Sequence, residues 1–201
     1  MVSRWAEGLQ PRNLTWIIPE LLAVSERPGG HHETHRAIRQ REEIVWLKAN
    51  KFIHVVSLLP TADNIASYTE SKMAWYHAPL ALDREGHPIL TELYENLDKW
   101  IRQGERTIMH EGMLGDVAFG AAAGFLCWEK VYYPATKAIY QIEKMTKRQL
   151  GPNGRQIVAT TSLLVAEREE KALADKTDPE SSDVLESIDD LKAGDNGEES
   201  M

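Results

Sequence analysis

Three short segments in the second half of the chain restrict the fold more than any other part of the sequence. Thr107–Met109 is an apolar strand candidate, residues 110–117 form a loop with two glycines, and Ala121–Leu126 has the small residues of a tightly packed helix. Further towards the N-terminus, Phe52–Leu59 is short, continuous and rich in β-branched residues, as expected for a central parallel strand. Together these segments predict an α/β fold.

The order of these residues resembles the signature loop of the cysteine-dependent protein phosphatases. That loop carries His-Cys, five variable residues and Arg between a strand and a small-residue helix, and His110 matches its His. The likeness is to the dual-specificity branch and covers about residues 14–160. Trp16–Ala23 is similar to the opening strand, and Trp75–Pro79 to the strand that leads into the general-acid loop. The resemblance implies a mostly parallel sheet of four or five strands with helices on both faces.

The side chains that carry the chemistry of that family are replaced in this sequence. The enzymes use a Cys thiolate as nucleophile and an Arg that holds the phosphate in bidentate fashion. Here Glu111 follows the His, and Val117 stands where the Arg is expected. If the Cys has instead been deleted, Asp116 replaces the Arg. Neither alignment retains a thiolate or a guanidinium. The degenerate phosphate loop comprises His110, Glu111, Gly112, Met113, Leu114, Gly115, Asp116 and Val117.

Two more residues take a role from the resemblance. In active relatives an Asp on the loop after His-x-Pro protonates the leaving oxygen, and Asp83 is the nearest match. The alternative for Asp83 is a solvated loop residue or a helix cap near Pro88. His110 is expected to support the loop by hydrogen bonding. The single cysteine, Cys127, lies several residues into the predicted helix, where a buried core thiol is expected.

Glu111 is expected to stabilise the loop from within. A carboxylate at the head of a helix faces N–H groups without helical partners and accepts charge-assisted hydrogen bonds from them. Such bonds favour the charged form, so the sequence predicts a lowered pKa for Glu111. The carboxylate would repel a phosphate charge about 4 Å away by about 4 kcal/mol at an effective dielectric of 20. The competing interpretation places Glu111 in solvent, free for a partner.

The histidine-rich segment His31–His35 resembles a set of metal ligands. It does not match the His-Glu-x-x-His pattern, because the spacing of its Glu and histidines is wrong by one residue. The basic residues that follow are expected to form a solvated helix face, the alternative being an anion site; they are Arg36, Arg39, Arg41, Lys48 and Lys51. We therefore expect no metal ion and no cofactor.

Negative charge is concentrated at the C-terminal end. The chain has a net charge of −8; residues 167–201 contain 13 acidic and 4 basic residues and contribute −9, whereas residues 1–166 contain 18 acidic and 19 basic residues. This division predicts a phosphatase-like domain over residues 1–166 and an acidic, largely disordered tail over residues 167–201. Leu163–Lys171 has a composition that can prolong a helix from the domain. The acidic balance argues against nucleic-acid binding.

Four apolar residues recur within the tail at helical spacing. An isolated helix of about two turns is not stable in water, but such a segment can fold into the groove of a partner protein. The alternative is a solvating tail whose apolar residues have no role. The four residues are Val184, Leu185, Ile188 and Leu191.

The sequence favours a catalytically inactive, phosphatase-like protein that binds or regulates another protein, and it predicts no enzymatic activity. One alternative is a divergent phosphatase or hydrolase in which Glu111 or Asp83 acts through water. Another is a sensor of anions or small ligands that uses the former phosphate loop. No apolar run approaches the roughly 18 residues of a membrane span, and the single cysteine fits a reducing compartment. We therefore expect a cytoplasmic protein that does not bind membranes.

Overall fold

The structure is a computed structural model and describes residues 8–31, 35–80 and 86–177. The chain divides into two units, residues 1–164 and residues 165–201. The strands are β1 (Thr15–Ile18), β2 (Leu22–Glu26), β3 (Phe52–Ser57), β4 (Ala74–His77) and β5 (Arg106–Glu111). The helices are α1 (Ala37–Ala49), α2 (Ile65–Glu70), α3 (Gly86–Arg102), α4 (Asp116–Trp128), α5 (Ala135–Thr146) and α6 (Pro152–Thr177).

The strands form one sheet in the order β1-β2-β5-β3-β4. β1 pairs with β2 in antiparallel orientation, and the other three neighbouring pairs are parallel. The prediction of a mostly parallel sheet of four or five strands is therefore confirmed. The carboxyl ends of the four parallel strands meet at one edge of the sheet, the edge at which open α/β folds bind ligands.

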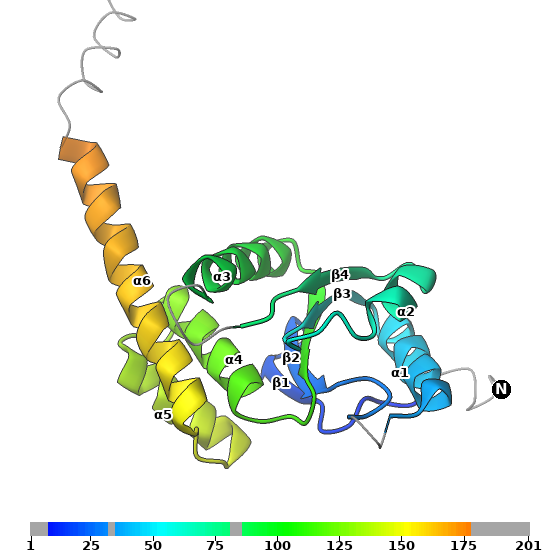
Figure 1. The fold of residues 1–201 in the computed structure, drawn as a ribbon. Coiled ribbons are helices and arrows are strands. Elements are labelled where there is room, and N and C mark those ends of the chain that lie inside the picture. The colour runs from blue at the N-terminus through cyan, green and yellow to red at the C-terminus, as the bar shows by residue number, and fades with distance from the viewer. Residues whose placement is uncertain (1–7, 32–34, 81–85, 178–201) are drawn as a thin grey trace, which may run out of the picture. The chain divides into compact units, whose positions relative to one another are not determined.

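Helices cover both faces of this sheet, as expected. α1 and α2 lie on one side, whereas α3, α4 and α5 lie on the other (Figure 1). On the first side the buried residues Ala23, Val55 and Ile108, from neighbouring strands, pack with Ile44 and Leu47 of α1. Burial of such apolar side chains contributes about 1.5–3 kcal/mol each, which makes this cluster a main source of stability.

The small residues of α4 allow this helix to approach its neighbours closely. Every residue of α4 from Ala118 to Trp128 is buried. A Cβ atom added to Gly120 would lie 2.5 Å from Cα of Gly154, so the two backbones touch at this point. Cys127 is buried, and burial raises the pKa of its thiol, in agreement with the expected core thiol. The helix that follows the loop is therefore held rigidly by packing.

The opening strand expected over Trp16–Ala23 is in fact two strands. β1 and β2 form an antiparallel hairpin, and the N–H of Leu21 donates to the carbonyl of Ile18 across the turn. The reversal occurs at Glu20, which has a left-handed backbone with φ 63°. Left-handed residues are typical of tight turns and interrupt a strand.

α6 continues to Thr177, in line with the expectation that Leu163–Lys171 prolongs a helix. The boundary expected after residue 166 therefore falls within a continuous helix. The rest of the expected tail, with the apolar residues from Val184 to Leu191, lies outside the described residues. Among the described helices, none combines the length and the apolar character that crossing a membrane requires.

Candidate functional site

The loop of interest leaves the central strand of the sheet. β5 ends at Glu111, residues 112–115 form the loop, and α4 begins at Asp116. The expected sequence of strand, loop and helix is present, and the loop stands at the carboxyl edge of the parallel strands. Met113 is 66% exposed at this loop, whereas Leu114 is buried.

The carboxylate of Glu111 points into the loop. Its Oε2 accepts hydrogen bonds from the backbone N–H of Gly115 at 3.3 Å and of Ala118 at 3.0 Å, and the N–H of Val117 also bonds to the carboxylate. These N–H groups belong to the residue before α4 and to its first turn, where helical partners are missing. The expected internal hydrogen bonds are confirmed, and the interpretation that places Glu111 in solvent is wrong.

The predicted direction of the pKa of Glu111 is wrong. Burial raises the pKa of this carboxyl, and the nearby Asp116 raises it further. The hydrogen bonds from the backbone act in the opposite direction, as predicted, but burial is the larger effect. Transfer of a carboxylate from water into a low-dielectric environment disfavours the charged form, and neutral N–H donors recover only part of that cost.

His110 is fully buried beneath the loop. Its Nε2 lies 2.9 Å from the hydroxyl of Tyr68 in α2, and its Nδ1 is buried with no partner among the described residues. Burial lowers the pKa of His110 to about 3, and the charge of Arg27 lowers it too, so the imidazole is neutral at physiological pH. The hydrogen bond of the ring is therefore to Tyr68 of α2 and not to the loop that it was expected to support.

Neither candidate for the position of the signature Arg brings a cation to the loop. Asp116 uses its Oδ2 to accept the N–H of Gly154 at 2.9 Å, at the start of α6. Its Oδ1 is buried and has no partner among the described residues. Val117, the other candidate, is a half-buried hydrocarbon. Under both alignments the first turn of α4 therefore carries an acidic or an apolar side chain.

Arg27, in the turn after β2, was not identified from the sequence. Its N–H donates to the carbonyl of Glu111 at 2.7 Å, which ties the turn to the end of β5. Its guanidinium donates to the side-chain oxygen of Asn64 at 3.0 and 2.8 Å and to Asp63 at 3.1 Å. The charge of Arg27 is thus held by Asp63 and Asn64, the two residues before α2. No signal in the sequence alone marks this contact, which arises because β2 pairs in parallel with β5 and sets Glu26 opposite Glu111.

The two described ends of the histidine-rich segment, His31 and His35, lie against Gly112 of the loop and Gly29 of the turn after β2. A Cβ atom added to Gly112 would lie 2.6 Å from Nδ1 of His31, and one added to Gly29 would lie 2.8 Å from Nε2 of His35. In the parts of the chain that the structure describes, no three His, Cys, Asp or Glu side chains are grouped as a metal site. His31 therefore covers one side of the loop.

The basic face expected after this segment is only partly solvated. Arg39 forms an ion pair with Glu43 at 2.7 Å, and Glu43 is buried and also accepts the N–H of Gly29 at 2.7 Å. This part of the expectation is wrong, because Arg39 neutralises a buried carboxylate. Asp83, the expected remnant of the general acid, lies outside the described residues.

Comparisons with known proteins place the fold. No protein-family profile matches the chain, and no curated protein sequence matches it. A structure of the kinase-associated phosphatase, with serine in place of its catalytic-site cysteine, has a TM-score of 0.62 at 16% identity and covers 78% of this chain and 97% of that chain. TpbA of P. aeruginosa has a TM-score of 0.56 at 17% identity, with 82% and 98% covered.

A leucine-rich-repeat and phosphatase domain protein from Entamoeba histolytica is also similar, with a TM-score of 0.56 at 7% identity; the match covers 77% of this chain and 94% of that chain. At such identities the likeness is one of fold. The chain therefore has the fold of the dual-specificity and tyrosine phosphatases.

Proposed function

We propose that the protein is a catalytically inactive protein of the phosphatase fold that acts by binding another protein. The observation that carries this proposal is the position of the Glu111 carboxylate, which accepts the N–H groups of Gly115 and Ala118. In an active loop, N–H groups of this kind hold the phosphate oxygens. Here they are already bonded to an anion that belongs to the chain.

Physical chemistry supports this reading of the loop. The cysteine-dependent phosphatases attack phosphorus with a thiolate, whereas Glu111 is a buried carboxyl whose Oε2 already accepts two backbone hydrogen bonds. A dianionic phosphate would have to displace the carboxylate or lie beside it. At about 4 Å and an effective dielectric of 20, each pair of like charges costs about 4 kcal/mol. The binding of phosphate is therefore opposed by the loop itself.

For the partner we propose contact through the apolar residues of the acidic tail, Val184, Leu185, Ile188 and Leu191. Their spacing supports an amphipathic helix that forms on the partner. We place the protein in the cytoplasm, a location supported by its single cysteine.

A second candidate function is a divergent hydrolase in which Glu111 acts through water. One observation favours it: buried carboxyls with raised pKa values occur at catalytic sites, where they act as general acids or bases. Against it, Glu111 already accepts backbone hydrogen bonds on Oε2, which reduces its capacity to take a proton from water.

The test of the binding function is a pull-down from cell extract with the full chain, read by mass spectrometry. The apolar face is removed in a variant with Leu185→Asp and Ile188→Asp. The matched control is Ser182→Asp, which adds charge to the same segment without touching that face. We expect partners that the wild type and the control retain and the double variant loses. Partners that survive the double variant would reject the tail as the binding segment.

A further inference from the structure

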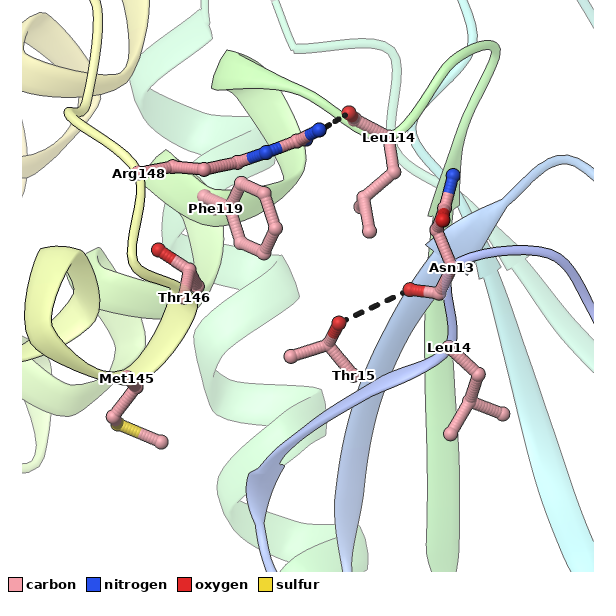
Figure 2. Close-up of a pocket in the computed structure, with 8 residues that line it drawn as sticks. All are labelled: Asn13, Leu14, Thr15, Leu114, Phe119, Met145, Thr146 and Arg148. Carbon is pink, nitrogen blue, oxygen red and sulfur yellow. Dashed lines mark hydrogen bonds between the residues drawn. The ribbon is translucent and has the colours of Figure 1, made fainter.

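An open pocket of about 370 Å³ lies next to the degenerate loop. Its walls come from three parts of the fold: the residues around the start of β1, the end of the loop with the start of α4, and the end of α5 (Figure 2). Pockets that bind small molecules generally measure about 300–1,000 Å³. The volume lies at the lower end of that range and suits a molecule about the size of one sugar unit.

The surface that a ligand meets in this pocket is mainly polar. Leu114 and Phe119 belong to its lining but are only 7% and 6% exposed, so they offer little apolar surface. Binding energy from the hydrophobic effect scales with the apolar area removed from water, and that area is small here. Four polar side chains stand more open to solvent: Asn13, Thr15, Thr146 and Arg148. The pocket therefore selects a ligand by charge and hydrogen bonds.

Arg148 supplies a positive charge at one wall of the pocket. In Figure 2 its side chain extends over Phe119 towards the carbonyl of Leu114. Its Nη1 donates to that carbonyl at 3.4 Å, a long hydrogen bond, and the described residues provide no other partner for the guanidinium. None of the described residues that line the pocket is acidic. Arg148 therefore keeps donors in the fork geometry that binds a carboxylate through two parallel hydrogen bonds.

Asn13 adds one donor from another wall, and Figure 2 shows its side chain and that of Arg148 on either side of Leu114. The amide nitrogen of Asn13 donates to Oε1 of Glu26 at 2.6 Å. An amide nitrogen carries two N–H groups, and the second has no partner among the described residues. The Glu26 carboxylate behind this amide repels a negative charge that approaches it. The Asn13 end of the pocket therefore suits a neutral oxygen, and the charge of a ligand belongs at the Arg148 end.

Two threonine hydroxyls of the pocket have used their donors and keep their acceptors. The hydroxyl of Thr15 donates to the carbonyl of Asn13 at 3.0 Å, and the hydroxyl of Thr146 donates to the carbonyl of Ile142 at 2.8 Å. The lone pairs of both oxygens remain able to accept a hydrogen bond. A ligand hydroxyl both donates and accepts, so this one kind of group matches the threonine oxygens as well as the N–H of Asn13.

From these groups we infer that the pocket binds a hydroxylated monocarboxylate of sugar size, the class of the sugar acids. Arg148 binds the carboxylate, the second N–H of Asn13 donates to a hydroxyl oxygen, and the oxygens of Thr15 and Thr146 accept hydroxyl protons. A phosphate monoester fits less well, because it carries close to two negative charges at pH 7 and the pocket lining offers one arginine. The site is separate from the N–H groups that Glu111 accepts and does not depend on the proposed function.

The test uses D-gluconate as the probe and the full chain, with affinities from calorimetry. Three ligands with the same six-carbon chain each change one feature: D-glucitol lacks the carboxylate, hexanoate lacks the hydroxyls, and D-glucarate has a second carboxylate at the far end. We expect D-gluconate to bind at least about tenfold more tightly than D-glucitol and hexanoate, because each has lost one set of contacts. It should bind at least about threefold more tightly than D-glucarate, whose second charge approaches Glu26. Backbone NMR shifts at Thr15 and Leu114 should locate the ligand in the pocket.

Two variants remove the groups that the assignment uses. Arg148→Gln should weaken D-gluconate by about tenfold, because the charge-assisted fork is lost. Asn13→Gly removes the second donor, and glycine suits the left-handed backbone at this residue, where φ is 54°; it should weaken D-gluconate by about threefold. The matched control is Lys144→Gln, which removes an exposed charge of α5 outside the pocket lining and should change the affinity by less than about twofold. Far-UV circular dichroism checks that each variant is folded.

Four results would overturn the assignment. The first is no saturable binding of D-gluconate up to about 10 mM, the range of the weakest specific ligands. The second is equal binding of D-gluconate and D-glucitol, or equal binding by the wild type and Arg148→Gln, which would show that the charge has no role. The third is equal binding of hexanoate, which would show that the hydroxyls are not recognised. The fourth is tighter binding of D-glucarate, which would show that the pocket accepts two negative charges.

Discussion

The amide nitrogen of Ala118 lies 3.0 Å from Oε2 of Glu111. The last residue of β5 thereby bonds to the first turn of α4, the turn that in an active phosphatase faces the bound phosphate. The carboxylate satisfies N–H groups that helix geometry leaves without partners. It also sets a negative charge where a substrate would bring two.

The purified protein should show no turnover of aryl phosphates or phosphopeptides. The reason is the proposed loss of the catalytic pair, since Glu111 and Val117 occupy the positions that the sequence resemblance gives to the thiolate and the guanidinium. The measurement is continuous release of phosphate under saturating substrate. The control is the rate of release that remains in the presence of a phosphatase inhibitor. Turnover that persists after stringent purification and disappears in Glu111→Ala would instead establish the water-based hydrolase.

Glu111→Cys combined with Val117→Arg should create binding of vanadate or sulfate, measured by calorimetry. The first change removes the internal anion and frees the N–H groups of Gly115 and Ala118, and the second adds a bidentate cation. Val117→Arg alone serves as the control. It should bind the anion far more weakly, because Glu111 still accepts the N–H groups of Gly115 and Ala118. Absence of binding by the double variant would mean that the backbone of the loop has itself diverged.

Glu111→Gln should gain stability relative to the wild type as pH rises from about 4 to 7. The folded-state pKa of Glu111 is raised by burial, so its contribution to stability is fully present below the unfolded value of about 4.3 and is lost as pH rises through the folded pKa. Glutamine does not ionise and has no such loss. Urea unfolding of both proteins at the two pH values gives the difference between their free energies of unfolding. The contributions of all other titrating groups cancel in this difference. If the difference in unfolding free energy is the same at both pH values, or changes in the opposite direction, the raised pKa of Glu111 is contradicted.

Tyr68→Phe should lower the free energy of unfolding by about 1–3 kcal/mol, the cost of leaving a buried polar group unsatisfied. The hydroxyl of Tyr68 bonds to Nε2 of His110 at 2.9 Å, and Nδ1 of that ring already lacks a partner among the described residues. Tyr140→Phe is the matched control, because Tyr140 is 65% exposed and should be near neutral. Equal midpoints of chemical denaturation for the two variants would show that the bond to His110 contributes nothing.

The ring of His110 should remain neutral at pH 5. Burial lowers its pKa from 6.5 to about 3, whereas the unfolded chain takes up the proton near 6.5. The contribution of His110 to stability is therefore present above pH 6.5 and declines as pH falls toward 3. The ¹⁵N shifts of its imidazole, followed between pH 4 and 8, report protonation directly. A titration midpoint near 6.5 would show that the ring is accessible to water.

The local pattern of the sequence was enough for part of this structure. The strand and helix around the loop follow from a run of apolar residues and a run of small residues, and the hydrogen bonds of Glu111 follow from its place before a helix. The direction in which the pKa of Glu111 is shifted does not follow from the local pattern. It depends on burial by segments far away in the chain, such as His31, which lies against Gly112. The pocket has the same origin, since Asn13, Leu114 and Arg148 come together only through the fold.

A loop that carries its own anion does not need a ligand to keep its shape. In an active phosphatase the converging N–H groups donate hydrogen bonds to substrate or to anions from solution. The loop is therefore sensitive to which anions are present. Here the carboxyl of Glu111 belongs to the chain itself, and its Oε2 accepts the N–H groups of Gly115 and Ala118. The conformation of the loop backbone should therefore be the same whether phosphate is scarce or abundant.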